Sequence, residues 1–119
     1  MKAYSKEAPK QVEQISPETY RVRWDIEKVK EEIEGKEIEQ YTYLECTVYA
    51  PLTQNSILQA AIREIISQSA ELKLINDYNA TQLEITTDQE AVEKYKSFIR
   101  WRNELKKKIG EICLYNNIQ

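Results

Sequence analysis

Residues 19–27 have the sequence Thr-Tyr-Arg-Val-Arg-Trp-Asp-Ile-Glu, and this stretch decides the fold. Apolar and charged side chains alternate along it without a break. The apolar positions are Tyr20, Val22, Trp24 and Ile26, and the charged positions are Arg21, Arg23, Asp25 and Glu27. Successive side chains of a strand point to opposite faces, so this period of two predicts a half-buried β-strand. We therefore expect a sheet with one face packed on a core.

A second alternating run covers residues 41–50 and ends at Pro51, which has no N–H to donate to a sheet. One face carries Leu44, Cys46, Val48 and Ala50, and the other carries Tyr41, Tyr43, Glu45, Thr47 and Tyr49. The tyrosines have two interpretations: cross-strand packing on an exposed sheet, or a surface for a partner protein, where tyrosine is enriched. A short run at residues 10–16, closed by a turn signal at Pro17, would add another strand.

Residues 28–40, between the two runs, are highly charged and have Gly35 at their centre. Ile33 and Ile38 flank this glycine, and they are too few apolar side chains to anchor the segment to a core. The segment is either a long hairpin tip with a glycine turn or a mobile charged loop. In both cases we expect it to project from the body of the protein.

After Pro51 the apolar spacing becomes that of helices. A first helix is expected to take its N-cap from Asn55 or Ser56, with an apolar stripe of Ile57, Leu58, Ala61, Ile62, Ile65 and Ile66. A second helix is expected over residues 70–83, with Leu72, Ile75, Asn79 and Leu83 along one side. Residues 67–69 either bend the chain between two helices or continue a single one.

The third helix has the clearest signals, because Thr87, Asp88 and Glu90 supply a start and the pattern extends to about Tyr115. Its seam positions are Ala91, Tyr95, Phe98, Arg102, Leu105, Ile109 and Ile112, which are alternately four and three residues apart. This heptad spacing suits helix pairing within one domain and also an intermolecular coiled coil. Arg102 either lies at the edge of the seam or pairs with a buried acid, and Trp101 is either an interface anchor or a core residue.

The 119 residues favour one domain, residues 1–119, with a β-rich part at 10–50 and a helical part at 55–116. We expect an α+β fold in which a small antiparallel sheet is followed by two or three helices, the last one long. One face of the sheet should pack on the stripe of the first helix. No run approaches the ~18 apolar residues of a membrane span, and no secretory signal follows the first residues.

The residue types present argue against catalysis. The chain has no histidine, which removes Ser-His and Cys-His pairs and the ordinary proton shuttle near neutral pH. Its glycines, Gly35 and Gly110, are too far apart for a phosphate-binding loop. Cys46 and Cys113 lie in apolar patterns typical of reduced core residues; a disulfide or metal pair is the alternative, but without histidine they cannot fill a four-ligand zinc site. We expect no enzyme activity, cofactor, metal or small-molecule substrate.

Charge is distributed unevenly. Residues 25–39 contain seven acidic and three basic side chains, whereas residues 94–108 contain seven basic side chains and one acidic, Glu104. These segments are two solvated surfaces, or they attract each other within a chain or between copies, or the basic helix meets nucleic acid. The pI of about 5.2 argues against nucleic acid, since such domains usually lie above about 9.

The helical half carries a resemblance. Residues 74–80, Leu-Ile-Asn-Asp-Tyr-Asn-Ala, precede an acidic break and then residues 93–105, Glu-Lys-Tyr-Lys-Ser-Phe-Ile-Arg-Trp-Arg-Asn-Glu-Leu. Over about residues 72–109 this resembles small tail-associated proteins of tailed bacteriophages, in particular tail-fibre assembly and tail-chaperone-like proteins. Tyr95, Trp101 and Arg102 match the recurrent aromatic and arginine pattern. The resemblance implies a virion component or assembly helper that binds rather than turns over a substrate.

From these observations we expect a bacteriophage structural or assembly protein that acts as an oligomeric protein-binding module. Its partners would be copies of itself or other phage structural proteins, and it would reside in the virion or the host cytoplasm. The alternative is a cytoplasmic adaptor or chaperone that binds another protein without joining a particle. The candidate interface residues are Tyr41, Tyr43, Tyr49, Tyr95, Trp101 and Arg102.

Overall fold

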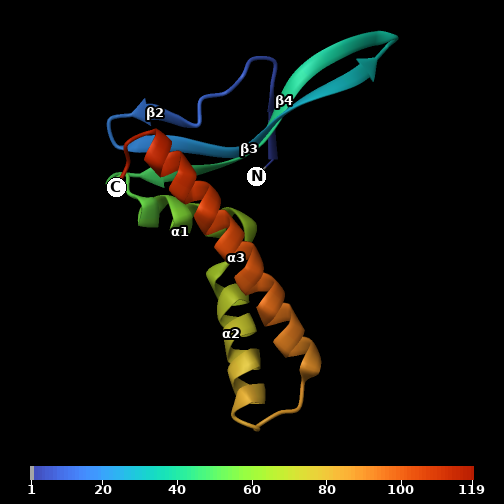
Figure 1. Cartoon of the computed structure of the whole chain (residues 1–119), viewed down its shortest axis with the longest axis vertical. Helices are drawn as coiled ribbons and strands as arrows, with labels where there is room; N and C mark the ends of the chain where they lie inside the picture. Colours follow the sequence, from blue (N-terminus) through green and yellow to red (C-terminus); the bar gives the residue numbers. More distant parts are fainter. Residues whose placement is uncertain (1) are drawn as a thin grey trace.

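The computed structural model describes residues 2–119 and has a four-stranded antiparallel sheet followed by three helices (Figure 1). The elements are β1 (Lys2–Ser5), β2 (Val12–Ser16), β3 (Thr19–Ile33), β4 (Lys36–Tyr49), α1 (Gln54–Ile65), α2 (Gln68–Gln82) and α3 (Gln89–Tyr115). The expected α+β fold with a long last helix is confirmed. A body of sheet, α1 and the C-terminal half of α3 carries two projections that point in different directions (Figure 1). We call residues 27–40 the hairpin arm and residues 68–98 the helical arm.

The sheet has the strand order β1-β4-β3-β2, with all neighbours antiparallel. The long hairpin of β3 and β4 forms its centre. The short strand β1 pairs only with residues 41–44 of β4, and β2 pairs only with residues 19–22 of β3. Within the described chain, the hairpin arm therefore extends beyond both edge strands as a two-stranded ribbon.

The core lies between one face of the sheet and the helices α1 and α3. Val22, Trp24, Cys46 and Val48 from the sheet meet Ile57, Leu58, Ala61 and Ile62 from α1 and Leu105, Ile109, Ile112 and Cys113 from α3. The expected packing of the sheet on the α1 stripe is thus confirmed. Ala50, which follows β4, is exposed, and so is Ile65, at 49%.

The strict alternation expected through Glu27 is wrong after Trp24, because β3 contains a β-bulge. Trp24 lies opposite Leu44, but the next paired residue of β3 is Glu27, so Asp25 and Ile26 together oppose one residue of β4. Asp25 adopts a positive φ of 52°. Its carboxylate forms an ion pair with Lys108 Nζ at 2.8 Å. A bulge redirects a side chain in this way, and here it ties the base of the hairpin arm to α3.

The sheet face that was expected to carry solvated charge contains a buried arginine. Arg23 Nε donates to Glu45 at 3.0 Å, and its Nη2 donates to Glu13 at 2.9 Å. Its Nη1 donates to the carbonyl oxygen of Lys10 at 3.2 Å, in the segment that connects β1 to β2. The guanidinium carbon also lies 5.5 Å from the centroid of the Tyr43 ring, which is buried. Contacts with this segment and with Glu13 of β2 bury a side chain on a face that the alternation alone assigned to solvent.

The helices begin at caps that differ partly from those expected. The N-cap of α1 is Thr53, not Asn55 or Ser56; Ser56 is the third helical residue and completes a capping box with Thr53. Ile66 ends α1 and Ser67 is the N-cap of α2, so the chain bends between two helices here instead of continuing a single one. Asp88 caps α3, as expected, by accepting from the backbone N–H of Ala91.

The seam of α3 is buried within its own chain, against two different neighbours. Ala91 and Phe98 are buried in the helical arm, where α3 lies beside α2, whereas Leu105, Ile109 and Ile112 are buried in the body. Tyr95 and Arg102 are half-buried. Of the two uses of the heptad spacing, the chain therefore shows the pairing within one molecule.

Candidate protein-interaction surfaces

The hairpin arm is a regular ribbon that ends in a two-residue turn. Ile33 pairs with Lys36, and Glu34 and Gly35 between them have φ values of 52° and 76°. Positive φ at both positions is the geometry of the type I′ turns that match the twist of antiparallel strands. Of the two alternatives for residues 28–40, the hairpin with a glycine turn is therefore confirmed.

The two faces of the hairpin arm differ in chemistry. Directly opposed residues share a face, so the register places Val29, Ile33 and Ile38 on one face, the side that continues from the core. Lys28 and Lys30 lie on the other face and pair with Glu39, at 3.0 and 3.9 Å. The Lys28 ammonium lowers the pKa of the Glu39 carboxyl, and Glu39 raises the pKa of Lys28. The register also places Glu31, Lys36 and Gln40 on the first face, so its apolar side chains alternate with polar ones, and Ile33 is 48% exposed.

The tip of the hairpin arm carries unpaired negative charge. Glu31 accepts a hydrogen bond from the Gln40 amide at 2.8 Å, but forms no ion pair with any described residue. Glu32 and Glu34 likewise have no ion-pair partner within residues 2–119, and both are exposed. The tip therefore presents three glutamates around the turn, together with the exposed Lys36, which also has no ion-pair partner among the described residues.

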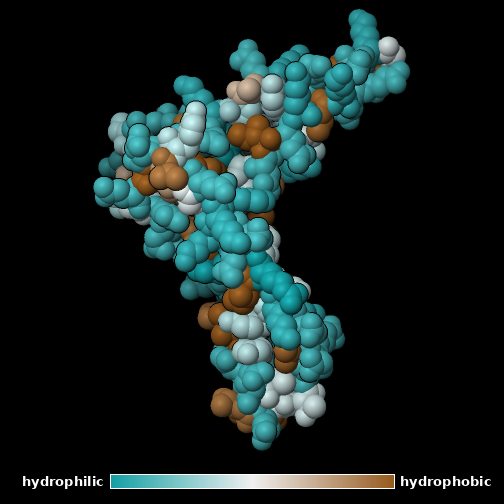
Figure 2. All heavy atoms as spheres, viewed as in Figure 1, coloured by the Kyte–Doolittle hydropathy of each residue, from teal (hydrophilic) through white to brown (hydrophobic). Residues whose placement is uncertain are grey.

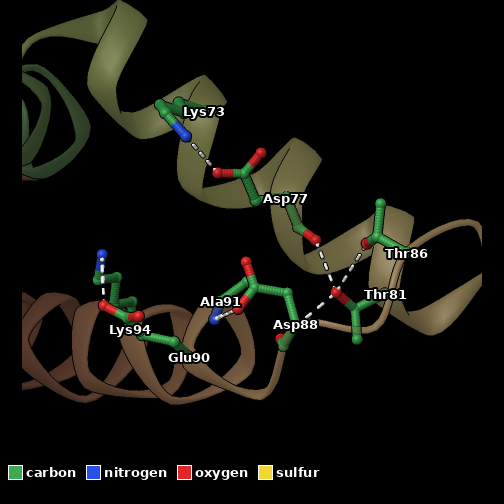
Figure 3. A network of polar contacts seen from close by, with 8 residues as sticks. All are labelled: Lys73, Asp77, Thr81, Thr86, Asp88, Glu90, Ala91 and Lys94. Carbon is green, nitrogen blue, oxygen red and sulfur yellow. Dashed lines mark hydrogen bonds and ion pairs between the residues drawn. The ribbon is translucent and has the colours of Figure 1, made fainter.

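The end of the helical arm is fixed by hydrogen bonds around Thr81 (Figure 3). The Thr81 hydroxyl lies 3.1 Å from the carbonyl oxygen of Asp77 and 3.3 Å from the hydroxyl of Thr86. It also lies 3.5 Å from the carbonyl oxygen of Asp88, the residue that caps α3. A single side chain of α2 thus contacts its own helix, the connecting loop and the start of α3.

This ordered loop holds large apolar side chains in solvent. Leu83 is 70% exposed and Ile85 is 74% exposed, and Leu72 on α2 is 50% exposed. Figure 2 shows hydrophobic surface at the far end of the helical arm. The sequence pattern placed Leu72 and Leu83 along one side of the second helix and did not single out Ile85. The loop is hydrogen-bonded and still exposes these side chains, which makes the end of the arm a candidate contact surface.

The six residues predicted as an interface lie in separate places. Tyr43 is buried under Arg23, Tyr41 is half-buried, and Tyr49 is 71% exposed at the end of β4. Tyr95 stacks on Tyr78 of α2 with ring centroids 4.4 Å apart, which joins the two helices of the arm. Trp101 is half-buried and packs against the core, and its ring lies 5.8 Å from that of Phe98. Arg102 is half-buried and forms no ion pair with a described residue.

A basic groove of about 500 Å³ lies on the body, between α3 and the start of α1. Arg100, Lys106 and Lys107 line it on the α3 side, and Gln54 lines it on the α1 side. A Cβ atom on Gly110 would lie 3.3 Å from the Gln54 side-chain nitrogen, so glycine permits this close approach. The acid in the groove, Glu104, is 3.5 Å from Lys107, whereas Arg100 and Lys106 have no ion-pair partner among the described residues.

The cysteines are free and buried. Burial raises the pKa of the Cys46 thiol to about 12 and also raises the pKa of the Cys113 thiol. Within residues 2–119, no three His, Cys, Asp or Glu side chains are grouped so that they could hold a metal ion. The described helices include none with the length and apolar character needed to cross a membrane.

Comparison of the chain with protein-family models, with curated proteins and with solved structures gives no match.

Proposed function

We propose that this chain is a non-enzymatic protein-binding module that oligomerises and acts as a bacteriophage structural or assembly protein. The observation that carries the proposal is the pair of arms that leave the body with apolar and charged surfaces unpaired (Figures 1 and 2). An enzyme of this size would be expected to concentrate its polar groups in a concave pocket. This chain instead places exposed apolar side chains and unpaired acidic side chains at the ends of projections, apart from the basic groove on the body.

The extended shape supports this proposal quantitatively. The radius of gyration is 18.0 Å, whereas a compact chain of this length would have about 13–14 Å. The accessible surface is 8489 Å², against about 6,700 Å² for a compact protein of 14.1 kDa. The excess, about 1,800 Å² on one chain, is about twice the ~800 Å² that each partner buries in a standard protein–protein interface. A partner would account for a shape that is costly for an isolated monomer.

Each arm also packs against little of the rest of its own chain. An isolated two-stranded ribbon is marginally stable in water, because one of its faces has nothing to pack against. No residue of α2 is fully buried, although Tyr78 stacks on Tyr95. Binding of another protein to either arm would bury apolar side chains that the monomer leaves exposed, such as Ile33 and Leu83.

The bacteriophage assignment within this proposal rests on the resemblance of residues 72–109. These residues cover most of the helical arm and the part of α3 that enters the body. The matching residues Tyr95 and Trp101 pack within the arm and at its junction with the body, which fits a structural role rather than a chemical site. An adaptor or chaperone that binds one partner outside a particle would use the same surfaces.

The test is the solution mass of the purified protein, measured by light scattering over a range of concentrations. A defined oligomer is expected. Replacement of Leu83 and Ile85 by serine, with Gln82→Ser as the matched control, tests whether the end of the helical arm contributes. A monomer at every concentration would contradict the oligomeric module and would favour the adaptor or chaperone.

A further inference from the structure

We infer that the acidic tip of the hairpin arm docks into the basic groove of a second copy of this chain. The inference rests on the proposed oligomeric function and names the partner and the two surfaces that meet. The tip contributes Glu31, Glu32 and Glu34, and the groove contributes Arg100, Lys106 and Lys107.

The charges of the two surfaces are complementary and are not neutralised locally. The three tip glutamates have no ion-pair partner among the described residues, whereas Glu37, which lies opposite Glu32, and Glu39 both pair with Lys30. In the groove, Glu104 is engaged by Lys107 at 3.5 Å, which leaves Arg100 and Lys106 unpaired within residues 2–119. Surfaces of opposite sign steer association and fix orientation between partners.

The shapes of the two surfaces also fit. The tip is a narrow two-residue turn, and the groove is an open hollow of about 500 Å³ bounded by α3 and Gln54. The side-chain amides of Gln54 and Asn103 line it and can hydrogen-bond carboxylates or the backbone of a turn. Because Gly110 has no side chain, the Gln54 side chain can lie close against α3 at this edge of the groove.

The tip of a chain cannot reach its own groove. The ion pair between Asp25 and Lys108 fixes the base of the hairpin arm beside α3. From there β3 runs eight more residues to Ile33, about 26 Å at the rise of a strand, and the arm points away from the helices (Figure 1). The occupant of the groove must therefore come from another molecule.

Contact between a tip and a groove is heterologous, so each copy donates one surface and accepts the other. Such contacts close into a ring or continue as an open stack. Each copy then takes part in two contacts and would bury about 800 Å² of its own surface in each, if the contacts are of standard size. The total of about 1,600 Å² per copy is close to the excess surface of the monomer.

The experiment exchanges the charges of the two surfaces and measures mass by light scattering at low salt. One variant carries Glu31→Lys, Glu32→Lys and Glu34→Lys, and a second carries Arg100→Glu, Lys106→Glu and Lys107→Glu. Each variant alone is expected to lose self-association by at least about tenfold in dissociation constant, because like charges then face each other. An equal mixture should associate again, since each reversed surface meets its complement on the other variant. A control with Lys2→Glu and Lys6→Glu changes charge away from both surfaces and should behave as the unmodified protein.

Two outcomes separate this inference from the function on which it rests. If the unmodified protein forms an oligomer that both charge variants retain, the tip-to-groove contact is wrong but the oligomeric module stands. If the unmodified protein is monomeric at low salt, both fail. Salt-sensitive DNA binding that is lost only in the groove variant, with an oligomer that is unaffected, would assign the groove to nucleic acid and overturn the inference. Circular dichroism of each variant shows whether the fold is retained.

Discussion

Replacement of Arg23 by methionine should destabilise the protein by about 2–4 kcal/mol. Arg23 is buried and makes charge-assisted hydrogen bonds to Glu13 and Glu45, at 2.9 and 3.0 Å, and one to the Lys10 carbonyl at 3.2 Å. Hydrogen bonds to charged groups contribute roughly 1.5–3 kcal/mol each. The side chains of Glu13 and Glu45 are 41% and 23% exposed, so water recovers part of the loss and the lower end of that range applies to each. Methionine retains the packing of the aliphatic stem.

The measurement is urea unfolding followed by tryptophan fluorescence, because Trp24 is 4% exposed and changes environment on unfolding. For a chain of 119 residues the expected loss corresponds to a decrease in Tm of about 8–16 °C. Arg21→Met is the matched control, since Arg21 lies on the same sheet face, is exposed, and should change stability by less than about 0.5 kcal/mol. An Arg23→Met protein as stable as the control would refute the conclusion that this guanidinium holds the sheet and the connecting segment together.

Three further changes test other parts of the structure. Trp24→Ala should cost about 3–5 kcal/mol of unfolding free energy, because the indole is buried in the core; unchanged thermal stability would contradict its placement. Gly35→Ala should destabilise the turn by about 1–2 kcal/mol, since φ is +76° and no atom lies within 4 Å of the added Cβ, so the cost is in the backbone alone. Hydrogen exchange should then accelerate in the hairpin arm and not in the core, and uniform acceleration would argue against an arm that opens separately. Cys46, with its pKa raised to about 12, should react slowly with thiol reagents at pH 8 until the protein unfolds; fast reaction of the native protein would contradict its burial. Because this folded-state pKa lies above the ordinary value of 9.0, its contribution to stability is complete below pH 9 and should be lost as the pH rises from about 9 to 12.

The sequence predicted the elements better than it predicted what covers them. Alternation identified the strand at residues 19–24 but gave no sign of the bulge at Asp25, which forms an ion pair with Lys108, a residue distant in the sequence. Burial of Arg23 could not be foreseen, because the segment that covers it is polar and has no periodicity. Its partners, Glu13 and the Lys10 carbonyl, are brought there only by the path of the chain.

For the long helix α3, too, the sequence predicted the element but not all of its neighbours. The heptad spacing identified which side of α3 is buried, because periodicity specifies a face. It could not show that the partner changes along the seam, from α2 near Phe98 to the body near Leu105. The exposed end of the helical arm was missed for a related reason: Leu83 and Ile85 resemble ordinary core residues, and only the turn held by Thr81 reveals that they face solvent.

The continuity of α3 has a mechanical consequence. This single helix of 27 residues, about 40 Å long, belongs to the body at one end and to the helical arm at the other. It contains no proline, and its glycine, Gly110, lies in the body half, so the usual causes of a kink are missing from the half that forms the arm. A load applied at Ile85 is therefore carried to the sheet without an intervening hinge. In an assembly, the chain would set a fixed distance between a partner bound at the end of the helical arm and a partner bound at the body.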